Sequence, residues 1–134
     1  MDIRKLTALS VTAIFMTACQ TTKMADTITP LSVDFSWDGS RACSSRPPAF
    51  HITQIPPETQ RLRFLMTDMD VPTFYHGGGT VPYDGSGQIA AGAFSYKGPC
   101  PPSGSHRYRW TVSAIDANDT IIAQGETTKS FPPE

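Results

Sequence analysis

Proline and glycine recur throughout this sequence, which contains 12 prolines and 10 glycines among its 134 residues. Proline breaks the interior of a helix and glycine weakens it, and no long run of apolar residues at helical spacing remains between them. Apolar and polar residues instead alternate, most regularly over residues 32–37, 61–66 and 107–115. Such alternation is typical of strands that bury one face. The sequence therefore predicts an all-β domain with little helix.

Two further short strands are expected near the C-terminus, at residues 121–123 and 127–131, the second of them at a sheet edge. Asp38-Gly39 and Asp84-Gly85 have the residue types of tight turns. Short strands joined by connections rich in proline and glycine favour an antiparallel β-sandwich.

The N-terminal region has the features of a secretory leader. Arg4 and Lys5 precede an apolar stretch, residues 6–16, that is too short to cross the ~30 Å core of a bilayer as a helix. The stretch ends in Met16-Thr17-Ala18-Cys19, which resembles a lipobox with methionine in place of the usual leucine. This resemblance implies a signal peptide at residues 1–18 and lipid attached to Cys19. An ordinary secretory signal with an incidental cysteine is the alternative.

Residues 19–30 are polar and show no hydrophobic pattern, so we expect a flexible tether there and a folded domain over residues 31–134. Gln20 follows Cys19, and the sorting rule of Gram-negative lipoproteins then implies the outer membrane, facing the periplasm. Several acyl chains on one cysteine would make this anchoring stable.

The formal net charge is −1 and no basic run is present, which argues against nucleic acid as a partner. With Cys19 modified by lipid, Cys43 and Cys100 are the remaining cysteines. An oxidising periplasm favours a disulfide between them, and the chain-entropy model assigns such a long loop ~4 kcal/mol of stability. Two separate buried thiols are the alternative.

Asp68 and Asp70 lie two residues apart, directly after the strand predicted at 61–67, and Pro72 follows them. In extended chain both carboxylates would point to the same side, where one would need a proton, a cation or a basic partner. An Asx turn before the proline, in which the aspartate binds its own backbone, is the alternative.

A second cluster begins with the stiff segment Gly98-Pro99-Cys100-Pro101-Pro102. His106 and Tyr108 follow at the start of the strand predicted over 107–115, two residues apart and therefore on one face. An imidazole and a phenol together suit a small anionic or polar group. A tyrosine buried in the core and a histidine bonded to backbone are the alternative.

Together these segments resemble the phosphatidylethanolamine-binding protein family, which includes the Raf kinase inhibitor proteins. The family carries D-P-D-x-P, G-P-C-P-P or G-P-P, and H-R-Y segments in this order, matched here by residues 68–72, 98–102 and 106–108. Arg46-Pro47-Pro48 resembles its S-P-P segment, with arginine in place of serine. The resemblance covers about residues 31–134 and implies a sandwich with a large central sheet, Greek-key connections and a small anion pocket.

Matched motif by motif, the resemblance implies a set of ligand-binding residues: Asp68, Asp70, Pro72, His76, Gly98, Pro99, Pro101, His106 and Tyr108. His76 is the weaker match, because glycines replace the hydrophobic strand that follows this histidine in the family. Met69 replaces the usual proline. No cofactor or metal is expected.

The segment His76-Gly77-Gly78-Gly79 also resembles the oxyanion-hole loop of esterases and lipases. That chemistry requires a G-x-S-x-G nucleophile elbow, which the sequence lacks. We therefore expect a glycine loop that passes close to the pocket while His76 faces it. A Gly78→Val substitution is expected to disturb the pocket rim more than the fold.

The sequence as a whole favours a lipid-anchored binding protein for a phosphate-type head group or another small anion. Protonation of His76 or His106 would offset the aspartates, so binding is expected to strengthen as the pH falls through the histidine range. A structural or protein-interaction lipoprotein is the first alternative, and a weak esterase is the second.

Overall fold

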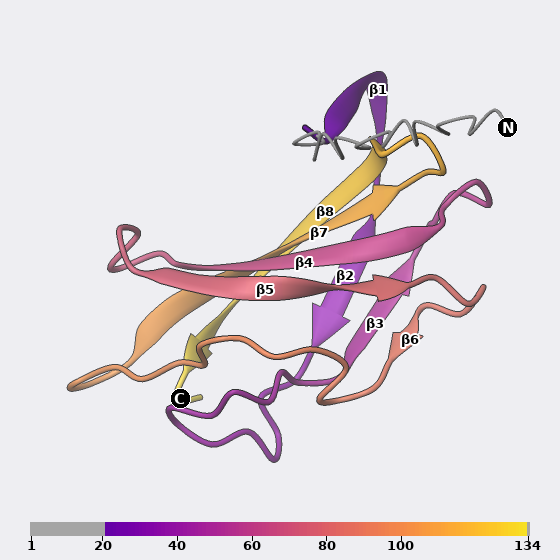
Figure 1. The fold of residues 1–134 in the computed structure, drawn as a ribbon. Helices are drawn as coiled ribbons and strands as arrows, with labels where there is room; N and C mark the ends of the chain where they lie inside the picture. Colours follow the sequence, from indigo (N-terminus) through magenta and orange to yellow (C-terminus); the bar gives the residue numbers. More distant parts are fainter. Residues whose placement is uncertain (1–20, 134) are drawn as a thin grey trace, which may run out of the picture.

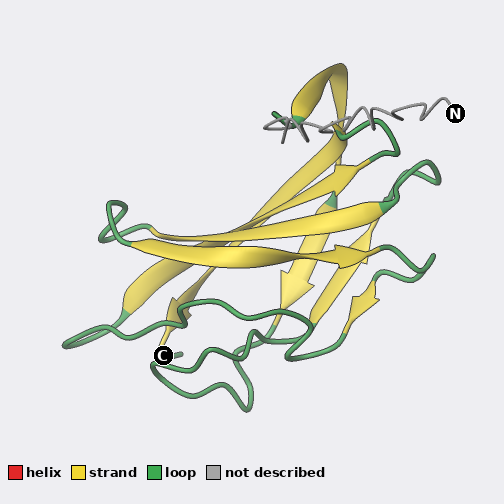
Figure 2. Ribbon diagram, viewed as in Figure 1, coloured by secondary structure: helices red, strands yellow, loops and turns green. Residues whose placement is uncertain are grey.

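The computed structural model describes residues 21–133, which form eight strands in two sheets (Figures 1 and 2). The strands are β1 (Lys23–Pro30), β2 (Ser32–Phe35), β3 (Phe50–Thr53), β4 (Arg61–Asp68), β5 (Tyr75–Pro82), β6 (Gln88–Ile89), β7 (His106–Ile115) and β8 (Thr120–Phe131). The predicted all-β class is confirmed. Residues 21–133 include no helix that would be able to span a membrane. The expected signal peptide and the lipidated Cys19 lie outside the described residues.

The large sheet has the strand order β1-β8-β7-β4-β5, and the small sheet has the order β2-β3-β6. Neighbouring strands are antiparallel except β1 and β8, which run parallel. β4 and β7 are adjacent although β5 and β6 lie between them in the chain. After β5 the chain adds β6 to the small sheet and then returns to the large one, so segments distant in sequence meet at the ends of β4 and β7.

The core lies between the sheets and is dominated by aromatic rings. The residues predicted to face inward on 61–66 and 107–115 are buried, and Trp110 is completely inaccessible. Phe50 of the small sheet reaches across, with its ring centroid 4.8 Å from that of Phe64 and 5.1 Å from that of Trp110. Rings of this size supply a large apolar area in a chain with few aliphatic runs.

Two expectations about the strands are corrected. Residues 23–30 form β1 where a flexible tether was expected, because the backbone groups of β8 offer hydrogen bonds that a side-chain pattern does not reveal. The two short strands expected at 121–123 and 127–131 are one strand, β8, and it lies between β1 and β7. Gly125 separates the two expected strands in the sequence. The position excludes a side chain, because a Cβ there would overlap the backbone oxygen of Leu31.

Candidate functional site

An open pocket of about 310 Å³ lies at one end of the large sheet, where β4 ends and β5 and β7 begin. The proline-rich segment before β7 forms its other wall. The lining residues are Asp68, Val71, Phe74, His76, Cys100, Pro101, Pro102, His106 and Tyr108. The strand order makes this meeting possible, because β4 is hydrogen-bonded to both β5 and β7.

Asp68 lies at the centre of the polar groups and is almost completely buried. Its Oδ2 atom is 2.8 Å from Nδ1 of His106, while its Oδ1 atom accepts hydrogen bonds from the backbone N–H groups of Asp70 and Val71 at 2.9 and 3.0 Å. Burial would raise the pKa of Asp68, but the hydrogen bonds from His106 and from these backbone groups outweigh it and hold the pKa below its usual value. Asp68 is therefore a carboxylate at neutral pH, and Nδ1 of His106 carries the proton between them.

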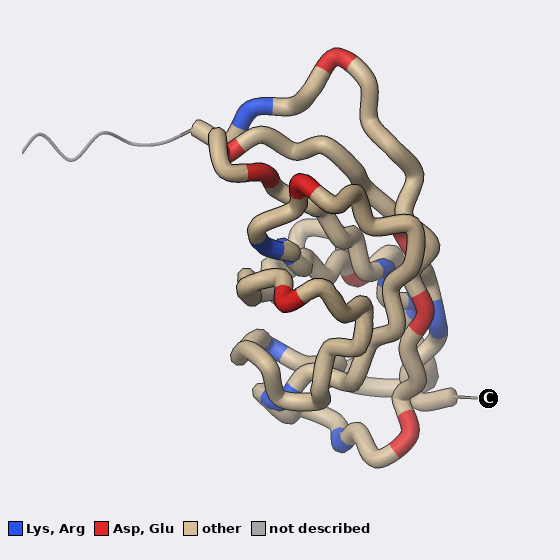
Figure 3. Tube along the Cα trace, turned by 90° about the vertical axis from the view of Figure 1, so that its right-hand side faces the viewer, with Lys and Arg blue, Asp and Glu red and all other residues tan. Residues whose placement is uncertain are grey.

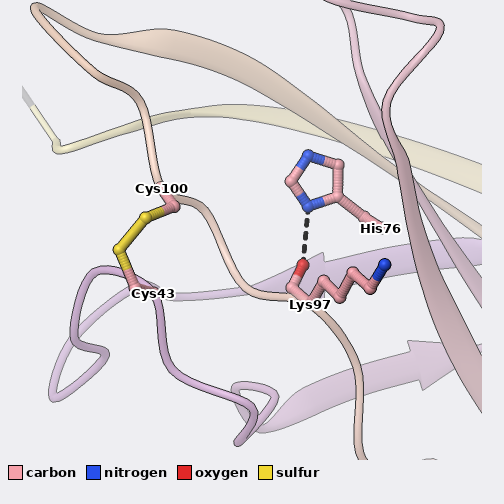
Figure 4. Close-up of a disulfide and its surroundings, with 4 residues drawn as sticks. All are labelled: Cys43, His76, Lys97 and Cys100. Atoms are coloured by element: carbon pink, nitrogen blue, oxygen red, sulfur yellow. Dashed lines mark hydrogen bonds between the residues drawn. A yellow bond between two sulfur atoms is a disulfide. The ribbon is translucent and has the colours of Figure 1, made fainter.

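His76 approaches the same carboxylate oxygen and is 4 % exposed. Its Nδ1 atom is 2.6 Å from the carbonyl oxygen of Lys97, as Figure 4 shows. Because a carbonyl only accepts hydrogen bonds, Nδ1 holds the proton, and Nε2 is the atom on the side of Asp68, 4.0 Å from its Oδ2. Both imidazoles thus face Oδ2 of Asp68, and the Nε2 atom of His106 is left for further contacts.

A β-bulge turns His76 into the pocket. Residues Leu65 and Thr67 of β4 pair with Gly78 and Tyr75 of β5, so the single residue Met66 faces two residues, His76 and Gly77. Gly77 has a φ of 75°, the left-handed conformation that a bulge of this kind requires. Without the extra residue, strict alternation from the buried Val81 would place Tyr75 inside and His76 outside.

The expected glycine loop is therefore corrected to a strand, and two of its glycines have packing roles. A Cβ on Gly78 would overlap the backbone oxygen of Phe64, and one on Gly79 would overlap the ring of Phe94. The expectation that Gly78→Val would affect the rim more than the fold is therefore reversed. The overlap with Phe64 indicates that this substitution would disturb the fold more than the rim. The glycines permit close pairing with β4 and the packing of Phe94 onto the core.

Tyr108 forms the floor of the pocket, directly opposite Asp68 in the β4–β7 pairing. Burial and the nearby charge of Asp68 raise the pKa of Tyr108 to about 12. A backbone hydrogen bond from Cys100 acts in the opposite direction and is outweighed. The phenol is therefore neutral and can donate a hydrogen bond. Its ring centroid lies 6.2 Å from that of His106 and 5.5 Å from that of His76. The predicted shared face of His106 and Tyr108 is confirmed.

Asp70 does not share a face with Asp68. The Asx turn at Asp68 ends β4, and Asp70 instead accepts hydrogen bonds from the backbone N–H and the guanidinium of Arg107, at 2.7 and 3.1 Å. These bonds hold the pKa of Asp70 below its usual value. Asp70 lies outside the pocket lining, so the expectation of two carboxylates in the pocket is wrong and the Asx-turn alternative is correct.

The proline-rich wall contributes Pro101 to the pocket, whereas Gly98 and Pro99 hold the wall in place. Gly98 donates its N–H to Ser44, and the carbonyl of Pro99 accepts the N–H of Cys43 at 2.8 Å. Cys43 and Cys100 form a disulfide, with their Cα atoms 4.6 Å apart, which fixes the same wall to the loop after β2 (Figure 4). The remaining predicted residue, Pro72, is exposed in the loop between β4 and β5 and does not line the pocket.

Sequence reasoning missed the apolar residues at the pocket mouth. Val71 and Phe74 line it and are 41 % and 50 % exposed, and the ring of Phe74 lies 4.6 Å from that of His76. An aromatic residue in a turn-like stretch two positions before the histidine was the available signal. The role of Lys97, whose carbonyl orients His76, had no signal in the sequence because any residue carries a carbonyl.

The residues present limit the chemistry of the pocket. Among the described residues no serine lines it, and the sulfur of Cys100 is in the disulfide. Within residues 21–133, no three histidine, cysteine, aspartate or glutamate side chains are arranged to hold a metal ion. What the site offers is one buried carboxylate, two imidazoles and a neutral phenol in a pocket with apolar walls, a combination that suits a small polar ligand held by hydrogen bonds.

No family model matches the chain, and no curated protein matches it significantly. A crystal structure of a protein from Chlamydia trachomatis, described as a homologue of phosphatidylethanolamine-binding protein, is similar in fold with a TM-score of 0.55. The two sequences are 19 % identical, and the match covers 80 % of this chain and 99 % of the other. The chain therefore has the fold of a phosphatidylethanolamine-binding protein homologue.

Proposed function

We propose that this chain binds a small anion, of which a phosphate-type head group is the leading candidate, in the pocket at the ends of β4, β5 and β7. The arrangement of Asp68 between two imidazoles carries the proposal. A carboxylate alone would repel an anion, and in this partly buried setting a cation beside it is needed. Protonated His106 and His76 supply that charge, while the phenol of Tyr108 supplies a neutral donor.

The charge balance makes the proposed binding dependent on pH. With both imidazoles neutral, the three groups carry the single negative charge of Asp68. With both protonated, they carry one positive charge, and the Nε2 atom of His106 becomes a donor to the ligand. Binding of an anion should therefore strengthen as the pH falls from about 8 to about 5.5, the range in which histidine side chains titrate.

The cellular setting is part of the proposal, and its main support is the leader sequence. The lipobox at Met16–Cys19 and Gln20 after it favour a chain anchored by lipid in the outer membrane of a bacterial envelope, facing the periplasm. A disulfide between Cys43 and Cys100 is consistent with an oxidising compartment. Charges of both signs are interspersed along the trace in Figure 3, which gives no support to nucleic acid as a partner.

The two alternative functions find less support in the site. A purely structural or protein-interaction role would be favoured by a pocket filled with side chains, but this pocket is open. An esterase would need a nucleophile, and Tyr108, whose pKa is raised, is the pocket residue with a free hydroxyl. Ligand binding is the function that uses the groups present.

The test is a thermal-shift series with inorganic phosphate, acetate, glycerol phosphate and phosphoethanolamine at about pH 5.5 and about pH 8. We expect at least one phosphate ligand to raise the melting temperature, and to do so more at the lower pH. His106→Ala and Tyr108→Phe should each reduce the shift. His51→Ala is the matched control, because His51 is exposed on β3 and lies outside the pocket. Unchanged melting with all four ligands at both pH values would refute the proposal.

A further inference from the structure

Exposed large apolar side chains are concentrated on the hairpin formed by β4 and β5. Among the described residues, four of the five such side chains belong to it: Leu65, Val71, Phe74 and Tyr75. Tyr75 is 72 % exposed, the most of the four. Single exposed apolar residues are common on protein surfaces, but a concentration of them marks an interaction site.

These four residues line two hollows on the hairpin. Leu65 and Tyr75 line a shallow groove on the outer side of the large sheet, the side away from the small sheet, together with Arg63 and the glycines of β5. Val71 and Phe74 line the mouth of the pocket. Phe74 and Tyr75 are adjacent in the chain, so successive residues of the hairpin border the mouth and the groove. β4 and β5 form one edge of the large sheet, as Figure 1 shows. We call Arg63, Leu65, Val71, Phe74 and Tyr75 the hairpin face.

Positive charge accompanies the apolar side chains. Three arginines elsewhere on the large sheet have a carboxylate partner, in the pairs Arg61–Asp119, Arg107–Asp70 and Arg109–Glu126. Arg63 makes no ion pair within residues 21–133 and donates a hydrogen bond to the hydroxyl of Thr22 at 3.3 Å. At the pocket mouth, the ammonium group of Lys97 lies 5.8 Å from the centre of the Phe74 ring. Basic and aromatic side chains in combination suit the surface of an anionic bilayer.

The start of the described chain lies beside this surface. Thr22 accepts a hydrogen bond from Arg63, which belongs to the hairpin face. Cys19 lies three residues before Thr22 in the sequence. Three residues span at most about 11 Å even when fully extended. A lipid on Cys19 would therefore enter its membrane close to the hairpin face, and the small sheet would lie on the far side of the domain.

We propose that the hairpin face lies against the bilayer that anchors Cys19, with the pocket mouth at the level of the head groups. This inference rests on the proposed lipid anchor and anion pocket, and it makes their ligand more specific. The ligand is a lipid head group of the anchoring leaflet, reached sideways from the membrane, and soluble phosphate compounds occupy the same pocket as its analogues.

The test uses the full-length lipidated chain in vesicles of phosphatidylethanolamine and phosphatidylglycerol that contain a nitroxide-labelled lipid. A fluorophore is attached at Tyr75→Cys or, as the matched control, at His51→Cys on the exposed side of the small sheet. With Cys19 lipidated and the other two cysteines in the disulfide, the introduced cysteine is the single free thiol. We expect strong quenching at position 75 and little at position 51. Leu65→Ser, added to the Tyr75→Cys variant, should weaken the quenching at position 75. Because Leu65 is exposed, this substitution should leave the melting temperature unaltered.

The possible failures are distinguishable. Vesicle-bound protein with no quenching at position 75, or with equal quenching at both positions, overturns the hairpin-face proposal and leaves the pocket intact. Protein that does not float with the vesicles overturns the lipid anchor and this proposal together. Failure of the pocket itself appears separately, as the absence of any thermal shift with phosphate ligands in solution.

Discussion

At Gly77 the backbone adopts a positive φ, and the orientation of His76 depends on this residue. The extra residue of the bulge changes which side of β5 faces the core, so that His76 and not Tyr75 enters the pocket. The neighbouring Gly78 and Gly79 are glycines because other atoms occupy the space of a side chain. Gly77 is thus required for its backbone conformation, and Gly78 and Gly79 are required for packing.

A Gly77→Ala substitution should weaken phosphate binding as well as stability. Alanine in the left-handed conformation costs roughly 1–2 kcal/mol, and relief of this strain would remove the bulge that orients His76. Gly85→Ala is the control, because Gly85 also has a positive φ of 88° but has open space around it and lies outside the pocket. Denaturant titration should show a similar loss in the free energy of unfolding for both variants. Phosphate binding should weaken only in Gly77→Ala. Equal binding by the two would contradict the role assigned to the bulge.

Asp68 should make the domain less stable in acid. Its pKa in the folded chain lies below the ordinary value, so the folded state binds fewer protons than the unfolded state at acid pH. The stabilisation is present above the ordinary pKa of about 3.9 and is lost as the pH falls through the lower, folded-state pKa. The free energy of unfolding, measured by urea titration from about pH 5 to about pH 2, should fall less steeply in Asp68→Asn than in the unmodified chain. Identical slopes would show that the bonds around Asp68 add no net stability.

At the level of elements, strands are placed in this fold by backbone pairing as much as by apolar patterning. β7 alternates regularly and is the centre of the large sheet, and it was predicted nearly to its ends. β1 has mostly exposed side chains and was not predicted, because it joins the sheet through hydrogen bonds to β8. A strand with little buried apolar area adds little to global stability.

β1 should therefore open locally while the rest of the domain stays folded. In hydrogen–deuterium exchange, the amides of Lys23–Pro30 should exchange much faster than those of His106–Ile115, which lie between two strands in the middle of the sheet. β8 offers an internal comparison, because it pairs with β1 on one side and β7 on the other. Equal protection of β1 and β7 would mean that β1 unfolds only with the whole domain.

Across the whole molecule, the Cys43–Cys100 disulfide joins the loop after β2 to the proline-rich wall of the pocket. The wall has no strand of its own between β6 and β7, and contacts such as Cys43 N–H to Pro99 hold it to the rest of the chain. The bridge encloses a sequence separation of 57 residues, which includes β3 to β6. It therefore restricts the unfolded chain and also positions one side of the pocket.

Replacing both Cys43 and Cys100 by serine should lower the free energy of unfolding by ~4 kcal/mol in the chain-entropy model. Phosphate binding should weaken as well, because Pro101 and Pro102 would lose their fixed position beside His106. Denaturant titration and thermal shift measure the two effects separately. Unchanged binding in the folded double variant would show that backbone contacts alone are sufficient to position the wall.

The sequence was sufficient to predict the all-β class, the inward residues of β4 and β7, and the proximity of His106 to Tyr108. These features depend on alternation along a single strand, which follows from local backbone geometry. The same local reasoning failed for Asp70, because the Asx turn that ends β4 depends on hydrogen bonds to specific backbone groups. It also failed for the glycines of β5, whose neighbours Phe64 and Phe94 are distant in the chain.

The pocket itself is a product of the strand order. Asp68, His76 and His106 come from three strand ends, and they meet because β4 pairs with both β5 and β7. Motif resemblance placed these residues in one site, but it did not distinguish the pocket-lining Pro101 from Gly98 and Pro99, which support the wall. Alternation is a property of neighbouring residues and is visible in the chain. Which strands pair, and where a bulge shifts their register, depends on free energies summed over contacts between distant segments, and these are established only in the folded domain.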